Sequence, residues 1–349
     1  MATIEEIATE AGVSIATVSR TLRSPNIMKT ANQRRVLQAA RKMGYEPGGR
    51  KTADRKTGTR QIVFLSFATV LSRDVFYHES TYMPIVNGLS RVLYPNGYDV
   101  QVVHEGLDFS LPPCLERQDI DGIIFHGRME GDFWEKYVKP FPCVGIQHID
   151  PALSCNWVKT DFTHVSYQAV AHLKALGHRK IGFVVDTVEL PLSNEQVKGF
   201  VDAMTQLQLP FRPDWVFARQ QTFNDGLIHM EYELPDLLPC MEKVFSSSDR
   251  PTALVCKDNW RASAAIHALN RMRVKVPDEV SVIGSCNEGS GEVLTCIDTR
   301  LSDVCAYAAQ VLLDLIHGRK KDDAMTYLLR PKLIAGNSVK SINGEYPKL

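Results

Sequence analysis

The fold class is decided by the first residues of the chain, where positions 2–22 read ATIEEIATEAGVSIATVSRTL. Thr3 and Ser14 are suited to cap two short helices, which we expect over residues 4–11 and 15–23. A Ser or Thr hydroxyl at such a position satisfies backbone N–H groups that the first helical turn leaves unpaired. Two short helices at this spacing predict a helix-turn-helix.

The two expected helices cross closely and pack through apolar side chains. Ala8 is small where they cross, and Gly12 can adopt the left-handed backbone conformation that the tight turn requires. We predict that Ile7, Val18 and Leu22 face inward and hold the helices together. The opposite face of the second helix then points outward. Near the N-terminus of that helix, this face is where the motif presents side chains to the major groove of DNA.

Candidate DNA contacts lie on that outward face, at the helix caps and in the basic segment that follows the headpiece. Most arginines are solvated surface residues, but the place of Arg20 on the recognition face favours a bidentate contact to guanine. Ile15 and Ala16 have no polar atoms and would contact bases by van der Waals packing. Hydroxyl side chains at such positions more often cap the helix or bind phosphate. The candidate set is Thr3, Ser14, Ile15, Ala16, Thr17, Ser19, Arg20, Arg23, Arg50 and Lys51.

A third helix is expected to complete an all-α headpiece over residues 1–47. Thr30 and Gln33 form a capping-box pattern before it. Four apolar residues then follow at helical spacing: Val36, Leu37, Ala40 and Met43.

The formal net charge is zero, but it is divided unevenly along the chain. Residues 1–60 hold 12 Lys and Arg against 5 Asp and Glu, a net charge of +7, and the remainder is −7. A basic segment on an acidic body favours a polyanionic partner, for which nucleic acid is the first candidate. The alternative is a charged segment that is merely solvated.

Residues 48–60 are polar with few large apolar side chains, which predicts a linker. From Gln61 onward, strand-like apolar runs alternate with helical patterns. This alternation predicts an α/β body with parallel sheets, and its length favours two lobes. The expected strands are 62–68, 98–103, 122–127, 143–146, 180–185, 252–256 and 280–284, and the expected helices include 82–95, 164–176 and 259–272.

Several classes of protein are disfavoured by what the sequence lacks. It contains no apolar run of about 18 residues and no secretory signal, so we expect a cytoplasmic protein without a membrane span. The eight cysteines have no metal-ligand spacing and are expected to be buried hydrophobes. No nucleophile, P-loop or dinucleotide motif stands in a fitting context, and the ten histidines are dispersed. We therefore expect no enzymatic activity, no metal and no cofactor.

The opening segment and RRVLQAARKMGYEP (34–47) closely resemble the N-terminal motif of the LacI/GalR family of bacterial transcription regulators. Further segments resemble the family in the same order. They are DIDGIIFHG (119–127), AHLKALGHRKIGFV (171–184), KGFVDAM (198–204), PTALVCKDN (251–259) and VPDEVSVIG (276–284). The resemblance implies a homodimer that binds a near-palindromic DNA operator, since two-fold protein symmetry matches two-fold DNA symmetry.

The resemblance also implies a body of two lobes like those of periplasmic sugar-binding proteins, with an effector between them and His178 as a framework residue. Each lobe would be discontinuous in sequence. The implied divisions are a headpiece at 1–47, a hinge at 48–60, a first lobe at about 61–160 and 288–326, a second lobe at about 161–287 and 327–340, and a tail at 341–349.

The hinge departs from the family pattern. The family's Ala-Arg-x-Leu element corresponds to Lys51-Thr52-Ala53-Asp54, which offers no leucine to wedge into the minor groove. We expect the linker to act instead through phosphate contacts, which make affinity depend on salt. The basic residues concerned are Arg50, Lys51, Arg55 and Lys56.

The candidate effector residues are also carried over from the resemblance. They are Phe76, Tyr77, Gln147, Asp161, Gln196, Asp258, Trp260 and Asn287. Gln196 stands where relatives have an arginine. Trp260 could stack on a ligand ring or could simply be a packed aromatic residue. The loss of charged groups favours a neutral ligand such as a carbohydrate, while another effector class, or none, stays open.

Two other functions compete with an effector-controlled regulator. A periplasmic solute-binding protein would share the two-lobed body, but it would need an export signal and would have no use for a headpiece. A regulator that binds DNA constitutively, without an effector, would fit the altered cleft.

Overall fold

A computed structural model describes residues 3–23, 31–43, 58–67, 79–105, 111–185, 191–218, 237–287, 293–319 and 323–343. The chain divides into two compact units. The first comprises Met1–Thr59 with Asp108–Ile120, and the second comprises Arg60–Leu107 with Asp121–Leu349.

Three short helices form the N-terminal headpiece: α1 (Ile4–Ala11), α2 (Ile15–Arg23) and α3 (Ala31–Lys42). Their positions confirm the expected helices. Ile7 and Val18 are completely buried, as predicted, whereas the Leu22 side chain lies outside the described residues. The headpiece core consists of small and β-branched side chains that allow short helices to pack closely: Ile7, Ala8, Ala11, Val18, Val36, Ala39 and Ala40.

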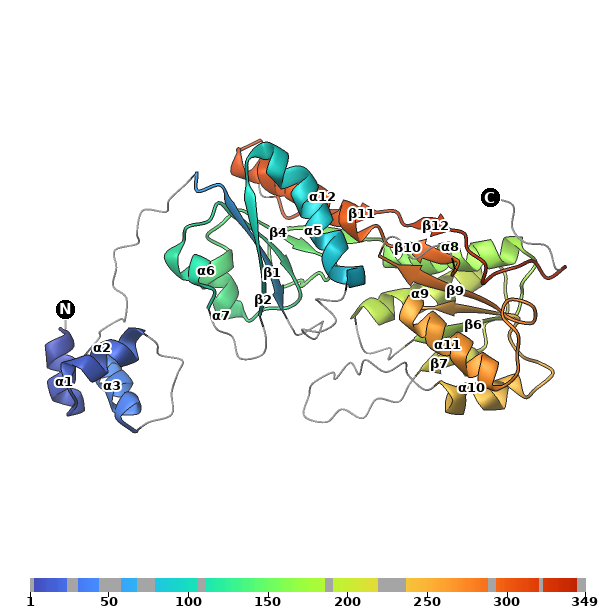
Figure 1. The fold of residues 1–349 in the computed structure, drawn as a ribbon, viewed down its shortest axis with the longest axis horizontal. Coiled ribbons are helices and arrows are strands. Elements are labelled where there is room, and N and C mark those ends of the chain that lie inside the picture. Colours follow the sequence, from blue (N-terminus) through green and yellow to red (C-terminus); the bar gives the residue numbers. More distant parts are fainter. Residues whose placement is uncertain are drawn as a thin grey trace. The chain divides into compact units, whose positions relative to one another are not determined.

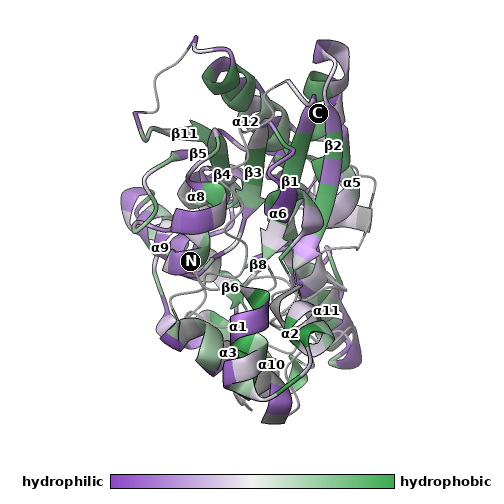
Figure 2. Ribbon diagram, turned by 90° about the vertical axis from the view of Figure 1, so that its left-hand side faces the viewer, coloured by the Kyte–Doolittle hydropathy of each residue, from purple (hydrophilic) through white to green (hydrophobic). Residues whose placement is uncertain are grey.

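The first sheet of the body has six strands in the order β11-β5-β4-β3-β1-β2, and every described pair is parallel. Its strands are β1 (Gln61–Phe67), β2 (Asp99–Glu105), β3 (Gly122–His126), β4 (Cys143–Ile146), β5 (Asn156–Thr160) and β11 (Thr326–Leu329). The central strand β3 is buried along its whole length and is largely hydrophobic (Figure 2). A continuous apolar strand of this kind is expected in a parallel sheet that is covered on both faces.

Helices α5 (Glu79–Leu93) and α12 (Leu301–Ile316) pack against each other and cover one face of the first sheet. They approach closely at Gly88, where an added Cβ would lie 2.2 Å from the Ser302 carbonyl oxygen. Trp134 packs on Phe125 of β3 with ring centroids 6.0 Å apart. The shorter elements of this part of the chain are a 3₁₀ turn (Tyr94–Asn96), α6 (Pro113–Arg117), α7 (Gly131–Phe133) and a π-helical turn (Trp134–Val138).

The second sheet also has six strands, in the order β12-β10-β9-β8-β6-β7. They are β6 (Ile181–Val185), β7 (Val216–Ala218), β8 (Ala253–Cys256), β9 (Ser281–Cys286), β10 (Cys296–Asp298) and β12 (Lys332–Ile334). The pairs are parallel except for β10 with β12, which is antiparallel.

Helices cover both faces of this second sheet. One core joins it to α8 (Phe162–Ala175) and α9 (Pro191–Gln206), and another joins it to α10 (Leu238–Phe245) and α11 (Asn259–Arg271). A 3₁₀ turn (Pro213–Trp215) leads into β7. The predicted α/β class with parallel sheets in two lobes is therefore confirmed. Figure 1 shows each sheet with its helices.

In the part of the chain that the structure describes, the polypeptide passes between the sheets three times, at residues 160–162, 298–301 and 329–332. Two of these passages differ from the expected divisions. Strand β10 was assigned to the first lobe but pairs with β9 in the second sheet, and most of β11 was assigned to the second lobe but pairs with β5 in the first. Both strands are short and carry no long apolar run, so their partners were not visible in the sequence.

Candidate nucleic-acid interface and ligand site

The helix-turn-helix owes its geometry to local capping. The Thr3 hydroxyl accepts a hydrogen bond from the Glu6 backbone N–H (3.2 Å), while the Glu6 carboxylate accepts one from the Thr3 N–H (2.8 Å). This capping box fixes the start of α1. Gly12 ends the helix in the left-handed conformation (φ 63°), and its N–H donates to the carbonyls of Ala8 and Thr9. A Cβ would be strained at this φ, as expected for a glycine that ends a helix.

The start of α2 exposes the residues that the sequence assigned to base contact. Ile15 is 52% exposed, although it is a large apolar side chain, and Ser14 and Ala16 are exposed beside it. Thr17 and Ser19 are half-buried. The Ser14 and Thr17 hydroxyls are 2.9 Å apart, and Ser14 also accepts from the Thr17 N–H at 3.2 Å. The Ser14 hydroxyl therefore caps α2, as the sequence predicted, and the Thr17 hydroxyl within the helix contacts it.

Arg20 and Arg23 belong to helix α2, but their side chains are outside the part of the protein that the structure describes. The same holds for the whole of the linker residues Arg50, Lys51, Arg55 and Lys56, and for the candidate cap Thr30. Opposite the exposed face, Val18 and Thr21 are buried at 0% and 2% exposure. The helix thus has one face in the core and one outside.

In the body, the three passages between the sheets are joined to one another by hydrogen bonds. Thr160 Oγ1 donates to the Thr299 carbonyl (2.6 Å), and the Asp161 N–H donates to the Leu329 carbonyl (3.0 Å). Arg300 Nη1 donates to the carbonyl of Arg330 (3.2 Å). Because each passage is hydrogen-bonded to another, we expect a conformational change in one passage to alter the other two.

Two candidate effector residues, Gln147 and Asn287, lie at the ends of this hydrogen-bonded chain. Gln147 is 6% exposed, and its Oε1 accepts from the Thr160 N–H at 3.0 Å while its Nε2 donates to Thr160 Oγ1 at 3.3 Å. Asn287 Oδ1 accepts from Thr299 Oγ1 at 2.6 Å. Each amide therefore holds one residue of the bonded pair, Gln147 holding Thr160 and Asn287 holding Thr299.

Two further candidates, Asp161 and Asp258, cap helices. Asp161 accepts from the His164 N–H at the start of α8 (3.0 Å). Asp258 accepts from the Arg261 N–H at the start of α11 (2.9 Å) and forms an ion pair with Arg261 Nη1 (3.1 Å). Trp260 lies beside Asp258 at the start of α11 and is 38% exposed.

Gln196 lies on α9 and is 3% exposed, and its side-chain Oε1 has no hydrogen-bond partner among the described residues. Phe76 and Tyr77 lie outside the described residues. The structure therefore links Gln147 to Asn287 through Thr160 and Thr299, but among the described residues no contact unites all the candidates in one site.

Four polar residues at the ends of first-sheet strands were missed by the sequence-based prediction: Ser66, His104, His126 and His148. His148 Nδ1 lies 3.1 Å from His126 Nε2. Burial lowers the pKa of His126 to about 4, with a smaller effect from His104. Burial also lowers the pKa of His148, with smaller effects from His126 and nearby cations. The available signal was that Ser66, His104 and His126 each follow an apolar run. The dispersal of the histidines along the sequence concealed this pattern.

Lys159 of β5 was also missed. It is 5% exposed, and its Nζ lies 2.7 Å from both carboxylate oxygens of Glu195 on α9. Because β5 belongs to the first sheet and α9 packs on the second, this ion pair connects the two lobes. A buried lysine normally requires such a partner.

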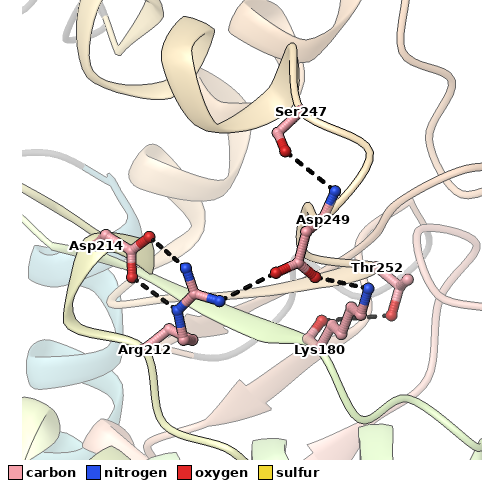
Figure 3. A network of polar contacts seen from close by, with 6 residues as sticks. All are labelled: Lys180, Arg212, Asp214, Ser247, Asp249 and Thr252. Carbon is pink, nitrogen blue, oxygen red and sulfur yellow. Dashed lines mark hydrogen bonds and ion pairs between the residues drawn. The ribbon is translucent and has the colours of Figure 1, made fainter.

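A polar network lies at the amino-terminal ends of the second-sheet strands, and its side chains bind one another. Arg212 binds both carboxylate oxygens of Asp214 (3.0 and 2.9 Å) and one oxygen of Asp249 (3.0 Å), as Figure 3 shows. Hydrogen bonds from Lys180 and Arg212 lower the pKa of Asp249. His178 nearby bonds Thr252 (3.0 Å) and the Lys340 carbonyl (2.9 Å), in keeping with its expected framework role.

Within the described residues, no group of three His, Cys, Asp or Glu is placed to hold a metal ion. In that same part of the chain, no helix has the length and apolar character needed to cross a membrane.

A helix-turn-helix with an exposed recognition face, followed by two lobes built on parallel sheets, defines a DNA-binding regulator with a body like that of a periplasmic binding protein. Residues 3–48 match the family described as bacterial regulatory proteins, lacI family. Residues 170–339 match the family described as periplasmic binding protein-like domain. The chain belongs to the LacI family of bacterial transcriptional regulators, a DNA-binding family without enzymatic activity.

Similar proteins agree with this assignment. The HTH-type transcriptional repressor PurR of Vibrio parahaemolyticus is 26% identical, covering 98% of this chain and 100% of that protein. Two solved structures share the fold. A transcriptional regulator CelR–cellobiose complex has a TM-score of 0.62 at 19% identity, covering 97% of this chain and 100% of that one. A lac repressor dimer bound to operator and an anti-inducer has a TM-score of 0.62 at 17% identity, covering 97% and 99%.

Proposed function

We propose that the chain is a cytoplasmic homodimeric repressor, that it binds a near-palindromic operator through α2, and that a small uncharged molecule such as a carbohydrate sets its affinity. The observation that carries the DNA-binding part is the exposure of Ile15 at 52% beside Ser14 and Ala16, while Val18 is fully buried. An exposed isoleucine at this position buries little apolar surface and so adds little to the stability of the headpiece itself. A base contact in the major groove would explain it.

The proposal for the dimer rests on symmetry and on a relative. A lac repressor of the same fold binds its operator as a dimer. Two copies of α2 related by a two-fold axis would enter successive major grooves, about 34 Å apart. The candidate contacts of each copy are Thr3, Ser14, Ile15, Ala16, Thr17, Ser19, Arg20, Arg23, Arg50 and Lys51.

The proposal for effector control rests on the bonded passages between the lobes. A ligand that changes the relation of the lobes would act on the Thr160–Thr299 and Asp161–Leu329 hydrogen bonds together. Effector and operator would then be linked ligands, each altering the affinity of the other by the same factor. A relative of the same fold binds cellobiose, which favours a carbohydrate.

Arg20 provides the test of sequence-specific binding. The operator is first selected from random DNA with the purified protein, and affinities are then measured by fluorescence anisotropy. We expect Arg20→Ala to cost about 1–3 kcal/mol on the selected operator and to flatten preference at one base position in each half-site. Equal losses on the operator and on random DNA would show that Arg20 contacts only phosphate.

The linker is tested by the salt dependence of the same binding. Neutralising the four basic linker residues should make the slope of log affinity against log salt shallower, by up to about 0.9 for each phosphate that the protein no longer neutralises. The residues to change are Arg50, Lys51, Arg55 and Lys56, with Lys42 as a control because it already pairs with Glu10 at 2.7 Å. An unchanged slope would exclude phosphate contacts by the linker.

A second candidate function is a regulator that binds DNA without an effector. The observation in its favour is that Gln147 and Asn287, two expected ligand residues, already bond the passages between the lobes. Operator affinity that is unchanged by any ligand able to stabilise the protein would support this alternative.

A further inference from the structure

Two cysteine side chains meet between neighbouring strands of the second sheet. Cys286 ends β9 and Cys296 begins β10, and their Sγ atoms lie 2.7 Å apart. Both residues are buried, at 8% and 0% exposure. A disulfide joins its sulfur atoms at about 2.0 Å, so a small movement of the two side chains brings them to bonding distance.

The register of the two strands explains why these thiols meet. Cys296 pairs with Gly284, which has no side chain, and Cys286 lies two residues further along β9. Residues two apart on a strand project from the same face, as do residues in register on neighbouring strands. The Cys296 side chain therefore has no side chain directly opposite it on β9 and can turn toward Cys286.

The cysteine pair is hydrogen-bonded to the passage between the lobes at residues 298–301. The Cys286 carbonyl accepts from the Thr299 N–H (2.8 Å), and the next residue, Asn287, accepts from Thr299 Oγ1 (2.6 Å). The Thr299 carbonyl in turn accepts from Thr160 Oγ1 of a second passage (2.6 Å). A shift of the end of β9 would therefore act directly on the residues that join the lobes.

We propose that Cys286 and Cys296 form a reversible oxidation site, at which an intramolecular disulfide changes the affinity of the protein for its operator. Formation of the disulfide does not depend on the proposed function. Its effect on DNA binding rests on that function, because it assumes that a change in the passages between the lobes alters operator binding.

Hydrogen peroxide is the oxidant. Cys286 is the more exposed of the two residues, so we assign the first step to its sulfur, which takes one peroxide oxygen to become a sulfenic acid while the other oxygen leaves as water. The Cys296 sulfur then attacks the sulfenic sulfur, which forms the S–S bond and releases a second water. In all, the two thiols give up two hydrogens with their electrons, and a dithiol reductant returns them.

Cys256 of β8 is a competitor for this reaction. It follows Val255, which pairs with Ile283 of β9, so it lies on the strand next to the pair. Burial, with a smaller effect from Asp258, raises the pKa of the Cys256 thiol well above its ordinary value. A thiol that stays protonated reacts slowly with peroxide. We therefore expect Cys256 to remain reduced.

The experiment treats the full-length protein with hydrogen peroxide and then blocks the remaining thiols with N-ethylmaleimide. Mass spectrometry of unreduced peptides identifies which cysteines are joined. Operator affinity is measured by fluorescence anisotropy on the reduced protein, on the oxidised protein and after treatment with dithiothreitol. The variants are Cys286→Ala and Cys296→Ala, with Cys155→Ala as the control because Cys155 is also buried, at 1% exposure.

We expect the oxidised wild type to contain a Cys286–Cys296 cross-link. Its operator affinity should differ from that of the reduced protein by about fivefold or more, which is the lower end of common coupling between sites. Dithiothreitol should restore the reduced value. Peroxide should leave the affinity of Cys286→Ala and Cys296→Ala unchanged, while Cys155→Ala should respond as the wild type does. The mapping uses the wild type alone, so it does not depend on the folding of any variant.

The other outcomes overturn the proposal in distinguishable ways. If peroxide joins neither cysteine, or joins either of them to Cys256, the oxidation site is wrong. A peroxide response that persists in Cys286→Ala would come from other residues and would also exclude this pair. If the disulfide forms but operator affinity stays the same, the regulatory role is wrong. The proposed function then still stands if a small molecule changes operator affinity in the same protein, and it fails separately if none does.

Discussion

The buried histidine His126 makes the protein sensitive to acid in a predictable window. Its imidazole is held neutral by burial, which lowers the pKa from 6.5 to about 4. The unfolded chain binds a proton on this residue below pH 6.5, whereas the folded chain does so only below about pH 4. Unfolding therefore becomes easier as the pH falls through this window, and the stabilisation is fully present above pH 6.5.

The size of the effect follows from the two pKa values. The lowering of the pKa from 6.5 to about 4 corresponds to roughly 3 kcal/mol of stability in full, of which about 2 kcal/mol is lost between pH 7 and pH 4.5. The groups that face this imidazole are His148, at 3.1 Å, and His104, whose charge lowers the pKa of His126 further. Burial also lowers the pKa of His148, so its protonation in the unfolded chain reinforces the trend.

Urea unfolding at pH 7 and pH 4.5 measures the effect in the wild type and in His126→Asn. Asparagine cannot gain a proton, so the variant should lose about 2 kcal/mol less than the wild type between the two pH values. The exposed His267→Asn should behave like the wild type. The reasoning is refuted if wild type and His126→Asn lose the same free energy over this interval.

Two further predictions concern packing and the link between the lobes. Gly88→Ala should destabilise the first lobe by about 2–3 kcal/mol, because its Cβ would lie 2.2 Å from the Ser302 carbonyl oxygen and 2.7 Å from Cys305 Cβ. Gly131→Ala, with nothing within 4 Å of its Cβ, is the control, and similar urea midpoints for the two would contradict the close approach. For Lys159 and Glu195, a double-mutant cycle with Lys159→Met and Glu195→Gln should give a coupling of about 1 kcal/mol, given that Glu195 is partly exposed. A coupling near zero would mean that the ion pair does not join the lobes in solution.

What the sequence predicted well was set by local chemistry. Thr3, Gly12 and Ser14 act on their own neighbours within a few residues, so the positions of α1 and α2 followed directly from the sequence. Apolar strands such as β3 and β4 were also found, because a strand buried on both faces must be apolar wherever its neighbours lie. The missed strand β5 reads NWVKT, and its buried lysine is paired with Glu195 of α9, which the sequence of the strand does not reveal.

The candidate ligand residues were harder to predict, because the role of a polar side chain depends on which partners the fold brings within hydrogen-bonding distance. Gln147 was expected to face a ligand, but Thr160, thirteen residues away, takes both ends of its amide. His126 and Ser66 are sixty residues apart in the chain and become neighbours only through the pairing of β1 with β3. Such a pair cannot be identified when each residue is considered within its own segment.

The interleaved order of the strands limits how the protein can be divided. A gene fragment that stops after Thr160 would lack β11, the edge strand of its own sheet, and α12, which covers that sheet. A fragment that begins at Asp161 would carry those two elements with no sheet to receive them. The same limit applies during synthesis. The first lobe cannot complete its fold until the ribosome has made the chain through Leu329, which is nearly the whole polypeptide.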